Sequence, residues 1–141
     1  MNIQIRYFTK SRKGNTKKIA DTLSSNLKIE SHSINSNLKE EVDILFLLNA
    51  MYANNIDKKV ANFISTNKDK IKLLVNICTS CSGRSTYSRI KKCAIENKVN
   101  IATEDKVIIG QWLFFNKNRP NEKDLSLAVN FAKEIINKYS K

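Results

Sequence analysis

Two largely apolar stretches of strand length, at 43–49 and 71–78, most constrain how this chain can fold. A strand with one solvated face alternates apolar and polar residues, whereas a strand buried on both faces is apolar throughout. Amphipathic helical patterns separate such stretches, as in Ile56, Val60 and Ile64, which repeat at about one helical turn. Because strict strand–helix alternation requires right-handed crossovers, the sequence predicts an α/β fold with a parallel sheet covered on both faces.

The other expected elements follow from the same periodicity and from helix-start signals. Gln4 and Arg6 are polar within the first strand, where a doubly covered strand is expected to be apolar. Trp112 is expected to pack against its apolar neighbours in 112–115, which extend or follow the fifth strand. The remaining strands are expected at 2–8, 27–34 and 99–109, and the remaining helices over 15–27, along Tyr87–Ala94, and from the Asn121 cap through Ile136.

Length and composition indicate one ordered domain over residues 1–141. The chain is 41% hydrophobic and contains only three glycines and one proline, which disfavours long linkers. No charged-then-apolar leader is visible, and no apolar run is long enough to cross a bilayer. Three cysteines, an odd number, favour reduced thiols. These features predict a cytoplasmic protein without membrane insertion.

The chain is strongly basic, with 25 Lys and Arg against 13 Asp and Glu, a net charge of +12. Such a charge favours acidic partners. Nucleic acid is disfavoured, because no aromatic residues interleave with the cationic clusters at Lys10–Lys18 and Arg89–Lys92. Alternatively, the lysines only solvate helix faces and carry no function.

The turn between the first strand and the first helix has the composition of a phosphate-binding loop. Unpaired N–H groups at a helix start, together with the helix dipole, favour an anion. Thr9, Ser11, Asn15 and Thr16 add side-chain donors, and Gly14 permits close approach of the backbone. The other interpretation is that these polar residues only cap the helix.

Two further loops leave the carboxyl ends of the third and fourth strands, where ligands of open α/β sheets bind. They span 49–55 and 79–87 and combine small polar residues with Tyr52 and Tyr87. A tyrosine can stack on an aromatic ring or hydrogen-bond its edge, although either tyrosine could equally be a packing residue.

The segment Ser11-Arg12-Lys13-Gly14-Asn15-Thr16 resembles the phosphate loop of the flavodoxin family, and Thr79–Gly83 and Trp112–Leu125 also resemble segments of that family. The resemblance covers essentially the whole chain. It implies a doubly wound, five-stranded parallel sheet of order 2-1-3-4-5, FMN as cofactor, and electron transfer with redox partner proteins, here with acidic surfaces.

The expected cofactor site has three parts. The phosphate would be held by Thr9, Ser11, Arg12, Gly14, Asn15 and Thr16. One side of the flavin ring would be lined by Ala50, Met51, Tyr52 and Asn54. The other side would be lined by Thr79, Ser80, Ser82, Gly83 and Tyr87. The expected role is that of an electron carrier, with no catalytic residues and no metal.

The chain departs from the family pattern in three respects. One is that Thr9-Lys10 could equally fill the family's Thr/Ser position in the phosphate loop. Lys13 stands where the family usually has Thr or Ser, and the chain is basic where flavodoxins are usually acidic near the flavin. A degenerate relative that has lost FMN therefore stays open as an alternative.

A rival site overlaps the fourth strand. Cys78, five residues, then Arg84-Ser85 matches the pattern of cysteine-dependent phosphatases, in which a thiolate attacks and an arginine clamps phosphate. Cys78 and Cys81 also form a Cys-x-x-Cys pair. His32, on the predicted edge strand, lies too far from the cysteines to complete a zinc site.

Overall fold

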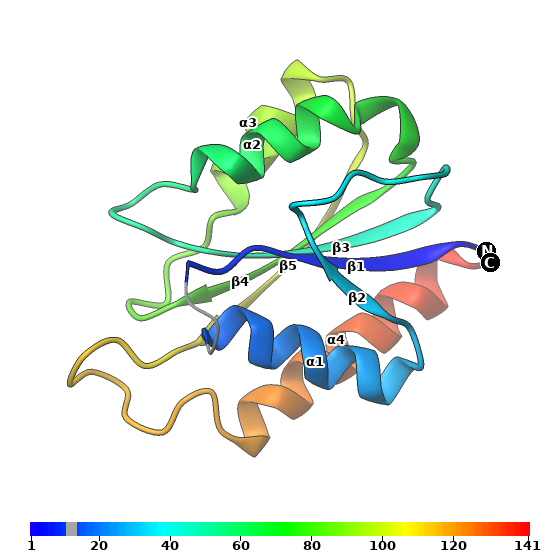
Figure 1. Cartoon of the computed structure of the whole chain (residues 1–141). Helices are drawn as coiled ribbons and strands as arrows, with labels where there is room; N and C mark the ends of the chain where they lie inside the picture. The colour runs from blue at the N-terminus through cyan, green and yellow to red at the C-terminus, as the bar shows by residue number, and fades with distance from the viewer. Residues whose placement is uncertain (11–13) are drawn as a thin grey trace.

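The structure is a computed structural model that describes residues 1–10 and 14–141. Five parallel strands form one sheet in the order β2-β1-β3-β4-β5, which confirms the predicted order and fold class (Figure 1). The strands are β1 (Ile3–Tyr7), β2 (Ser31–Ser33), β3 (Ile44–Ala50), β4 (Leu74–Ser80) and β5 (Ile101–Ile109). The helices are α1 (Asn15–Leu27), α2 (Lys58–Thr66), α3 (Tyr87–Glu96) and α4 (Glu122–Tyr139), with a 3-10 turn at Lys68–Lys70.

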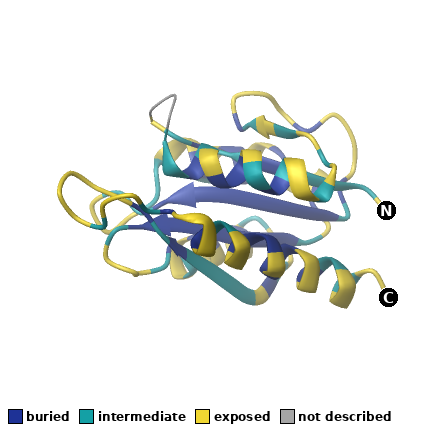
Figure 2. Cartoon of the chain, turned by 90° about the horizontal axis from the view of Figure 1, so that it is seen from below, coloured by how far each residue is buried: buried dark blue, intermediate teal, exposed yellow. Residues whose placement is uncertain are grey.

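Helices α1 and α4 cover one face of the sheet, and α2 and α3 cover the other (Figure 1). Successive side chains of a strand point to opposite faces, so β3 supplies both cores. Phe46 and Leu48 lie in the core beneath α1 and α4, whereas Leu45 and Leu47 lie in the core beneath α2 and α3. All seven residues of β3 are buried, as its apolar sequence predicts (Figure 2).

Arg6 explains why a polar residue occupies a doubly covered strand. Its guanidinium is buried and donates hydrogen bonds to the backbone oxygens of Ser33 (2.9 Å) and Ser36 (2.6 Å). It also lies 5.8 Å from the ring centre of Phe63, and burial lowers the pKa of Arg6. Arg6 therefore holds the connection that follows β2, and its role is structural.

One element differs from expectation, and one of two expected arrangements is found for another segment. Strand β2 has three residues rather than eight, because Lys28 ends α1 in the left-handed conformation (φ 58°) and the chain turns before pairing with β1. Residues 112–115 follow β5 rather than extend it, the second of the two expected arrangements, and form a tight turn in which Trp112 and Phe115 exchange backbone hydrogen bonds. Within the described part of the chain, no helix is both long and apolar enough to cross a membrane.

Candidate functional site

The loops that follow β1, β3, β4 and β5 emerge at one edge of the sheet, because all strands are parallel (Figure 1). This carboxyl edge carries most of the predicted site residues. The strands that lead to it are buried, whereas the loops beyond them are largely exposed (Figure 2). A rigid sheet thus presents polar loops to solvent, the usual arrangement of a ligand site in this type of fold.

The start of α1 is the best candidate for binding an anion. Gly14 occupies the N-cap with an extended backbone (φ −68°, ψ 156°), and none of the described side chains caps the helix. The first turn contains no acidic residue, so nothing in it repels an anion. Ser11 and Arg12, predicted members of this loop, lie outside the described residues.

The Thr16 side chain, predicted to help hold the phosphate, contacts another predicted site residue in the structure. Its hydroxyl is buried and hydrogen-bonds the hydroxyl of Thr79 at the end of β4, at 3.0 Å. Two predicted site residues therefore contact each other and tie the start of α1 to the sheet. The backbone N–H of Thr16 stays at the helix start, where an anion would bind.

Asn15 connects the same helix start to the β5–α4 loop. Its side-chain amide donates to the backbone oxygen of Gln111 at 3.0 Å. A Cβ on Gly110 would lie 2.5 Å from that amide nitrogen, so a larger residue at this position would displace the Asn15 side chain. Sequence reasoning missed Gly110 and Gln111. The one available signal was that Gly110, one of three glycines, directly follows the fifth strand.

The loop after β3 makes a tight turn, with Ala53 (φ 49°) and Asn54 (φ 64°) in the left-handed region. Tyr52 is half-buried at its start: its ring meets Phe8 edge to face, at 6.4 Å, and the Lys10 ammonium lies 4.2 Å from the ring centre. Burial raises the pKa of Tyr52. The loop after β3 is thus joined to the loop after β1, as the predicted site requires.

The loop after β4 contacts the loop after β3. Arg84 donates from its guanidinium to the side-chain oxygen of Asn54 at 3.1 Å. The hydroxyls of Ser80 and Ser82 lie 3.2 Å apart, and Gly83 has φ +84°, a conformation that L side chains rarely adopt. Ala50 and Met51 are the other two residues predicted to line the ring on the side of the loop after β3. Ala50 is the last residue of β3, and Met51 donates its N–H to the backbone oxygen of Thr79 at 3.2 Å.

A buried polar network lies beneath these loops. Asn49 donates to Asn76 at 2.7 Å, and Thr86 donates its hydroxyl proton to Asn49 at 2.7 Å. Asn76 also donates to Asp105 at 2.8 Å, and Asp105 accepts a hydrogen bond from the Ser85 hydroxyl. The network joins β3, β4 and β5 to the loop after β4 and fixes where that loop leaves the sheet.

Sequence reasoning missed this network. The sequence does contain a signal for it: Asn49 and Asn76 are amides in two stretches whose other residues suit a strand buried on both faces. Buried amides need hydrogen-bond partners, so two of them on neighbouring strands point to each other.

Tyr87 does not lie with the other predicted site residues at the carboxyl edge of the sheet. It is the first residue of α3, and its hydroxyl donates to the backbone oxygen of Ala102 at 3.1 Å, near the amino end of β5. The side chain is thus directed away from the carboxyl edge and ties α3 to the sheet. Tyr52 is the better-placed of the two tyrosines for contact with a ring.

The geometry does not support a cysteine-dependent phosphatase. Cys78 lies within β4, fully buried, and burial raises the pKa of its thiol, which disfavours the thiolate that such chemistry needs. Arg84 bonds Asn54 instead of facing Cys78. Cys78 and Cys81 are free thiols. Among residues 1–10 and 14–141, no His, Cys, Asp and Glu side chains gather as a metal site.

This architecture, with polar loops at the carboxyl edge of a parallel sheet of order 2-1-3-4-5 and helices on both faces, is that of a doubly wound α/β protein. A family model described as a flavodoxin domain matches residues 7–90, more than half of the chain. The chain therefore belongs to the flavodoxin family.

Solved structures agree on the fold. A flavodoxin from the domain Archaea is 15% identical, with each chain fully covered and a TM-score of 0.69. A short-chain flavodoxin associated with a PDU bacterial microcompartment is 14% identical over 99% of each chain, with a TM-score of 0.70. Flavodoxin 2 from Bacillus cereus is 15% identical over 99% of this chain and 100% of its own, with a TM-score of 0.69. No curated protein matches the sequence.

Proposed function

We propose that this protein binds FMN at the carboxyl edge of its sheet and carries electrons between partner proteins. One observation supports the proposal above others. The start of α1 carries no side-chain cap among the described residues and no acid in its first turn, and polar loops converge around it. Together with membership of the flavodoxin family, this favours a phosphate-bearing cofactor.

The residues present fit FMN in two respects. The phosphate would sit at the N–H groups that follow Gly14, in a loop whose Thr9 adds a hydroxyl. The flavin ring would lie between the loop of Tyr52 and the loop of Ser80–Gly83, joined by the Arg84–Asn54 hydrogen bond. The left-handed residues of both loops expose backbone N–H and C=O groups that suit the polar edge of a ring.

FMN would supply the redox chemistry, and the protein would supply binding, orientation and electrostatics. Thr16, Thr79, Asn49 and Asn76 act by holding the loops in place. The same interpretation leaves no catalytic residue to assign. The odd number of cysteines, all free, supports a reducing cytoplasmic location as part of the proposal.

The positive charge should act on the cofactor and on its partners. Reduction adds negative charge to a flavin, and Lys10 at this edge, with the net charge of +12, should oppose it less than an acidic surface would. We expect a less negative potential for full reduction than is usual in the family, with the difference shrinking as salt rises. Acidic redox partners are expected for the same reason, with association that slows at high salt.

A visible spectrum of the purified protein, followed by calorimetric titration with FMN and with riboflavin, tests the proposal. FMN binding that is much tighter than riboflavin binding is the expected result, because only FMN reaches the α1 start with a phosphate. Equal binding of the two would place the phosphate elsewhere. If neither FMN nor riboflavin bound at a protein concentration on the order of tens of micromolar, the result would favour the alternative that this protein is a degenerate relative that has lost FMN.

A further inference from the structure

Four consecutive apolar residues of the loop between β5 and α4 are exposed, and we name this segment, Trp112–Phe115, the aromatic tip. Trp112 is 60% exposed, Leu113 64%, Phe114 84% and Phe115 60%. The rings of Trp112 and Phe115 stack at 6.1 Å with an interplanar angle of 12°. Trp112 thus packs against its neighbour Phe115, as expected, but the pair stays exposed to solvent. A surface cluster of large apolar side chains this exposed indicates an interaction site.

The backbone of the tip is hydrogen-bonded within itself and to Gln111, while its apolar side chains are exposed to solvent. Trp112 and Phe115 exchange backbone hydrogen bonds of 3.1 and 2.9 Å, and the Gln111 amide donates to the Leu113 oxygen at 3.1 Å. Backbone groups paired in this way can enter an apolar phase at lower cost.

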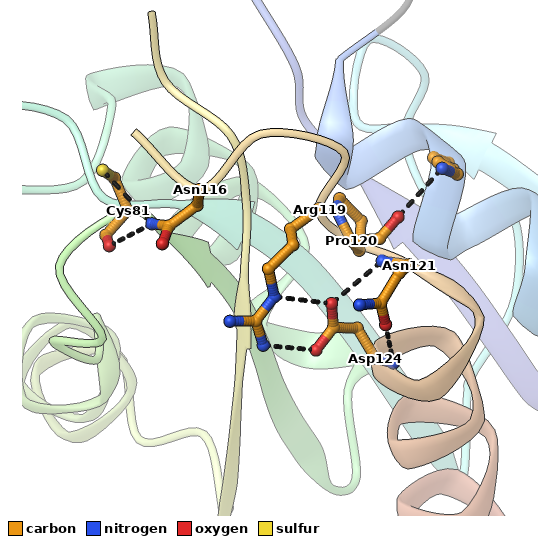
Figure 3. Close-up of polar contacts among 7 residues, drawn as sticks. Cys81, Asn116, Arg119, Pro120, Asn121 and Asp124 are labelled. Atoms are coloured by element: carbon orange, nitrogen blue, oxygen red, sulfur yellow. Dashed lines mark hydrogen bonds and ion pairs between the residues drawn. The ribbon is translucent and has the colours of Figure 1, made fainter. Parts of the chain in front are cut away.

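The base of the loop is fixed to the rest of the protein (Figure 3). Asn116 donates to the backbone oxygen of Cys81 at 2.8 Å, and Arg119 forms a two-pronged ion pair with Asp124 at 2.7 and 3.0 Å. The Lys18 ammonium donates to the Pro120 oxygen at 2.9 Å. The tip thus projects from a well-anchored loop at the carboxyl edge (Figure 1).

The charges near the tip select its partner. Among the described residues of the carboxyl-edge loops, the cations are Lys10, Arg84, Lys117 and Arg119, and the acid is Asp57, 3.9 Å from Lys10. Arg119 is already paired with Asp124, which leaves exposed Lys117 and Arg84 to face an anion. Trp, Phe and Leu backed by Lys and Arg are the residues that enter the boundary between lipid headgroups and acyl chains.

We propose that the aromatic tip inserts into the surface of an anionic lipid bilayer and docks the carboxyl edge of the protein against it. The tip would supply apolar side chains without spanning the bilayer, and the loop cations would attract the headgroups. The proposal replaces the expectation of no membrane insertion, which rested on the lack of an apolar run long enough to cross a bilayer. This inference does not depend on FMN binding, because the tip and Lys117, which the test varies, lie outside the proposed cofactor site; of the two cations left to face an anion, Arg84 also contacts a loop of that site.

Trp112 is the single tryptophan of the chain, so its fluorescence reports on the tip alone. The full-length protein is mixed with phosphatidylcholine vesicles, or with vesicles that contain about one third phosphatidylglycerol, with FMN at saturating concentration and without it. Co-sedimentation and a blue shift of the emission are expected with the anionic vesicles, at low salt most strongly. Failure of FMN binding would leave this result unchanged.

Matched variants separate insertion from nonspecific attraction. Phe114→Ser should lower partitioning about tenfold or more, whereas Ile95→Ser, which removes a 62% exposed side chain from the far end of α3, should leave it unchanged. Lys117→Glu should weaken binding more than Lys92→Glu, although both alter the net charge equally. Trp112 fluorescence is preserved in all four.

Three results would overturn the proposal. One is an emission spectrum that anionic vesicles do not shift although FMN does, which would assign the tip to the flavin. The second is lipid-independent self-association that Phe114→Ser abolishes, which would make the partner a second copy of the chain. The third is equal loss of vesicle binding in Lys117→Glu and Lys92→Glu, which would reduce the effect to net charge.

Discussion

Helices α1 and α4 lie side by side on one face of the sheet and both start at the carboxyl edge, yet their first turns differ (Figure 1). The start of α4 is closed by its own residues: the Asn121 side chain accepts from the Asp124 N–H, and the Asp124 carboxylate accepts from the Asn121 N–H and from Arg119. The start of α1 has Gly14 as its cap and no acid. One helix start is satisfied by its own residues, whereas the other has no side-chain cap among the described residues and is the start to which we assign the phosphate in our proposal.

The difference follows from what each helix start must do. A capping box typically stabilises a helix by about 0.5–2 kcal/mol, so forgoing one has a cost in stability. If FMN binds as proposed, its phosphate at the same N–H groups would restore that free energy only when the cofactor is present. The comparison therefore predicts that the apo protein is weakest near α1, and substitutions at the two helix starts should have opposite consequences.

The largest effect is expected for Gly14→Asp. The extended backbone at Gly14 accepts any L residue, and aspartate is a favoured cap, so the free energy of unfolding of the apo protein should rise by about 0.5 kcal/mol. The new carboxylate would occupy the N–H groups and repel the FMN phosphate. FMN affinity should fall at least about 100-fold, or about 2.7 kcal/mol, by calorimetry.

Riboflavin and Gly14→Ser are the controls for that substitution. Riboflavin lacks the phosphate and should bind Gly14→Asp and the wild type equally. Serine caps without charge, so its effect on FMN affinity should be smaller than that of aspartate. A Gly14→Asp protein that binds FMN as tightly as the wild type would show that the phosphate does not sit at α1.

At α4, Asp124→Ala removes the acceptor of the Asn121 N–H and leaves the guanidinium of Arg119 without its carboxylate partner. Asp124 is almost fully buried, and Arg119 holds its pKa below the usual range. Urea denaturation should show a loss of about 2–3 kcal/mol in the free energy of unfolding. FMN affinity of the folded protein should stay within about threefold of the wild type.

Glu122→Ala changes an exposed acid in the same first turn and should lower the free energy of unfolding by only about 0.5 kcal/mol. If Asp124→Ala weakened FMN binding as severely as Gly14→Asp, the two helix starts would not differ in function, and the comparison would fail.

Sequence patterns identified α1 and α4 but not the role of each side chain at their ends. The boundaries Asn15–Leu27 and the Asn121 cap were predicted because local signals determine them: an apolar repeat and a cap followed by an acid three residues later. The order of the strands came from the family resemblance rather than from local pattern.

Long-range pairings were beyond local pattern. The sequence gives no sign that Thr16 bonds Thr79, that Asn15 lies against Gly110, or that Tyr87 reaches Ala102, because these partners meet only after the sheet forms. The exposure of the aromatic tip was missed for a related reason. Apolar residues ordinarily predict burial, whereas here polar contacts such as those of Gln111 and Asn116 hold the loop in an exposed position.

Substitution of Thr16 tests whether its hydroxyl stabilises the fold or binds the cofactor phosphate. Thr16→Val leaves the buried Thr79 hydroxyl without this hydrogen bond, and the free energy of unfolding should fall by about 1 kcal/mol. FMN affinity should change by less than about threefold, because the helix start would contribute the backbone N–H. Thr16→Ser, which keeps the hydroxyl, should recover much of the stability. A loss of FMN binding with stability intact would instead assign the hydroxyl to the phosphate.

The smallest effect is expected at the far end of α4, where Glu104 of β5 accepts hydrogen bonds from Lys138 (2.8 Å) and Tyr139 (2.9 and 3.0 Å). The Lys138 ammonium, followed by Tyr139 and Thr103, lowers the pKa of Glu104 to about 2. A carboxylate whose pKa is depressed on folding stabilises the native state above its unfolded pKa, here 4.5, and loses that contribution as pH falls through the folded value.

Glu104→Gln should therefore lower the free energy of unfolding by about 1 kcal/mol above pH ~5, after allowance for screening at the exposed Lys138, and the difference should vanish near pH ~2. Asp21→Asn, which breaks the exposed Lys17–Asp21 pair on α1, is the matched control and should change stability by less than about 0.5 kcal/mol. Urea denaturation across this pH range measures both. A Glu104→Gln difference that persisted unchanged to low pH would mean that the residue acts through packing, and that α4 is tied to the sheet by its apolar face rather than by charge.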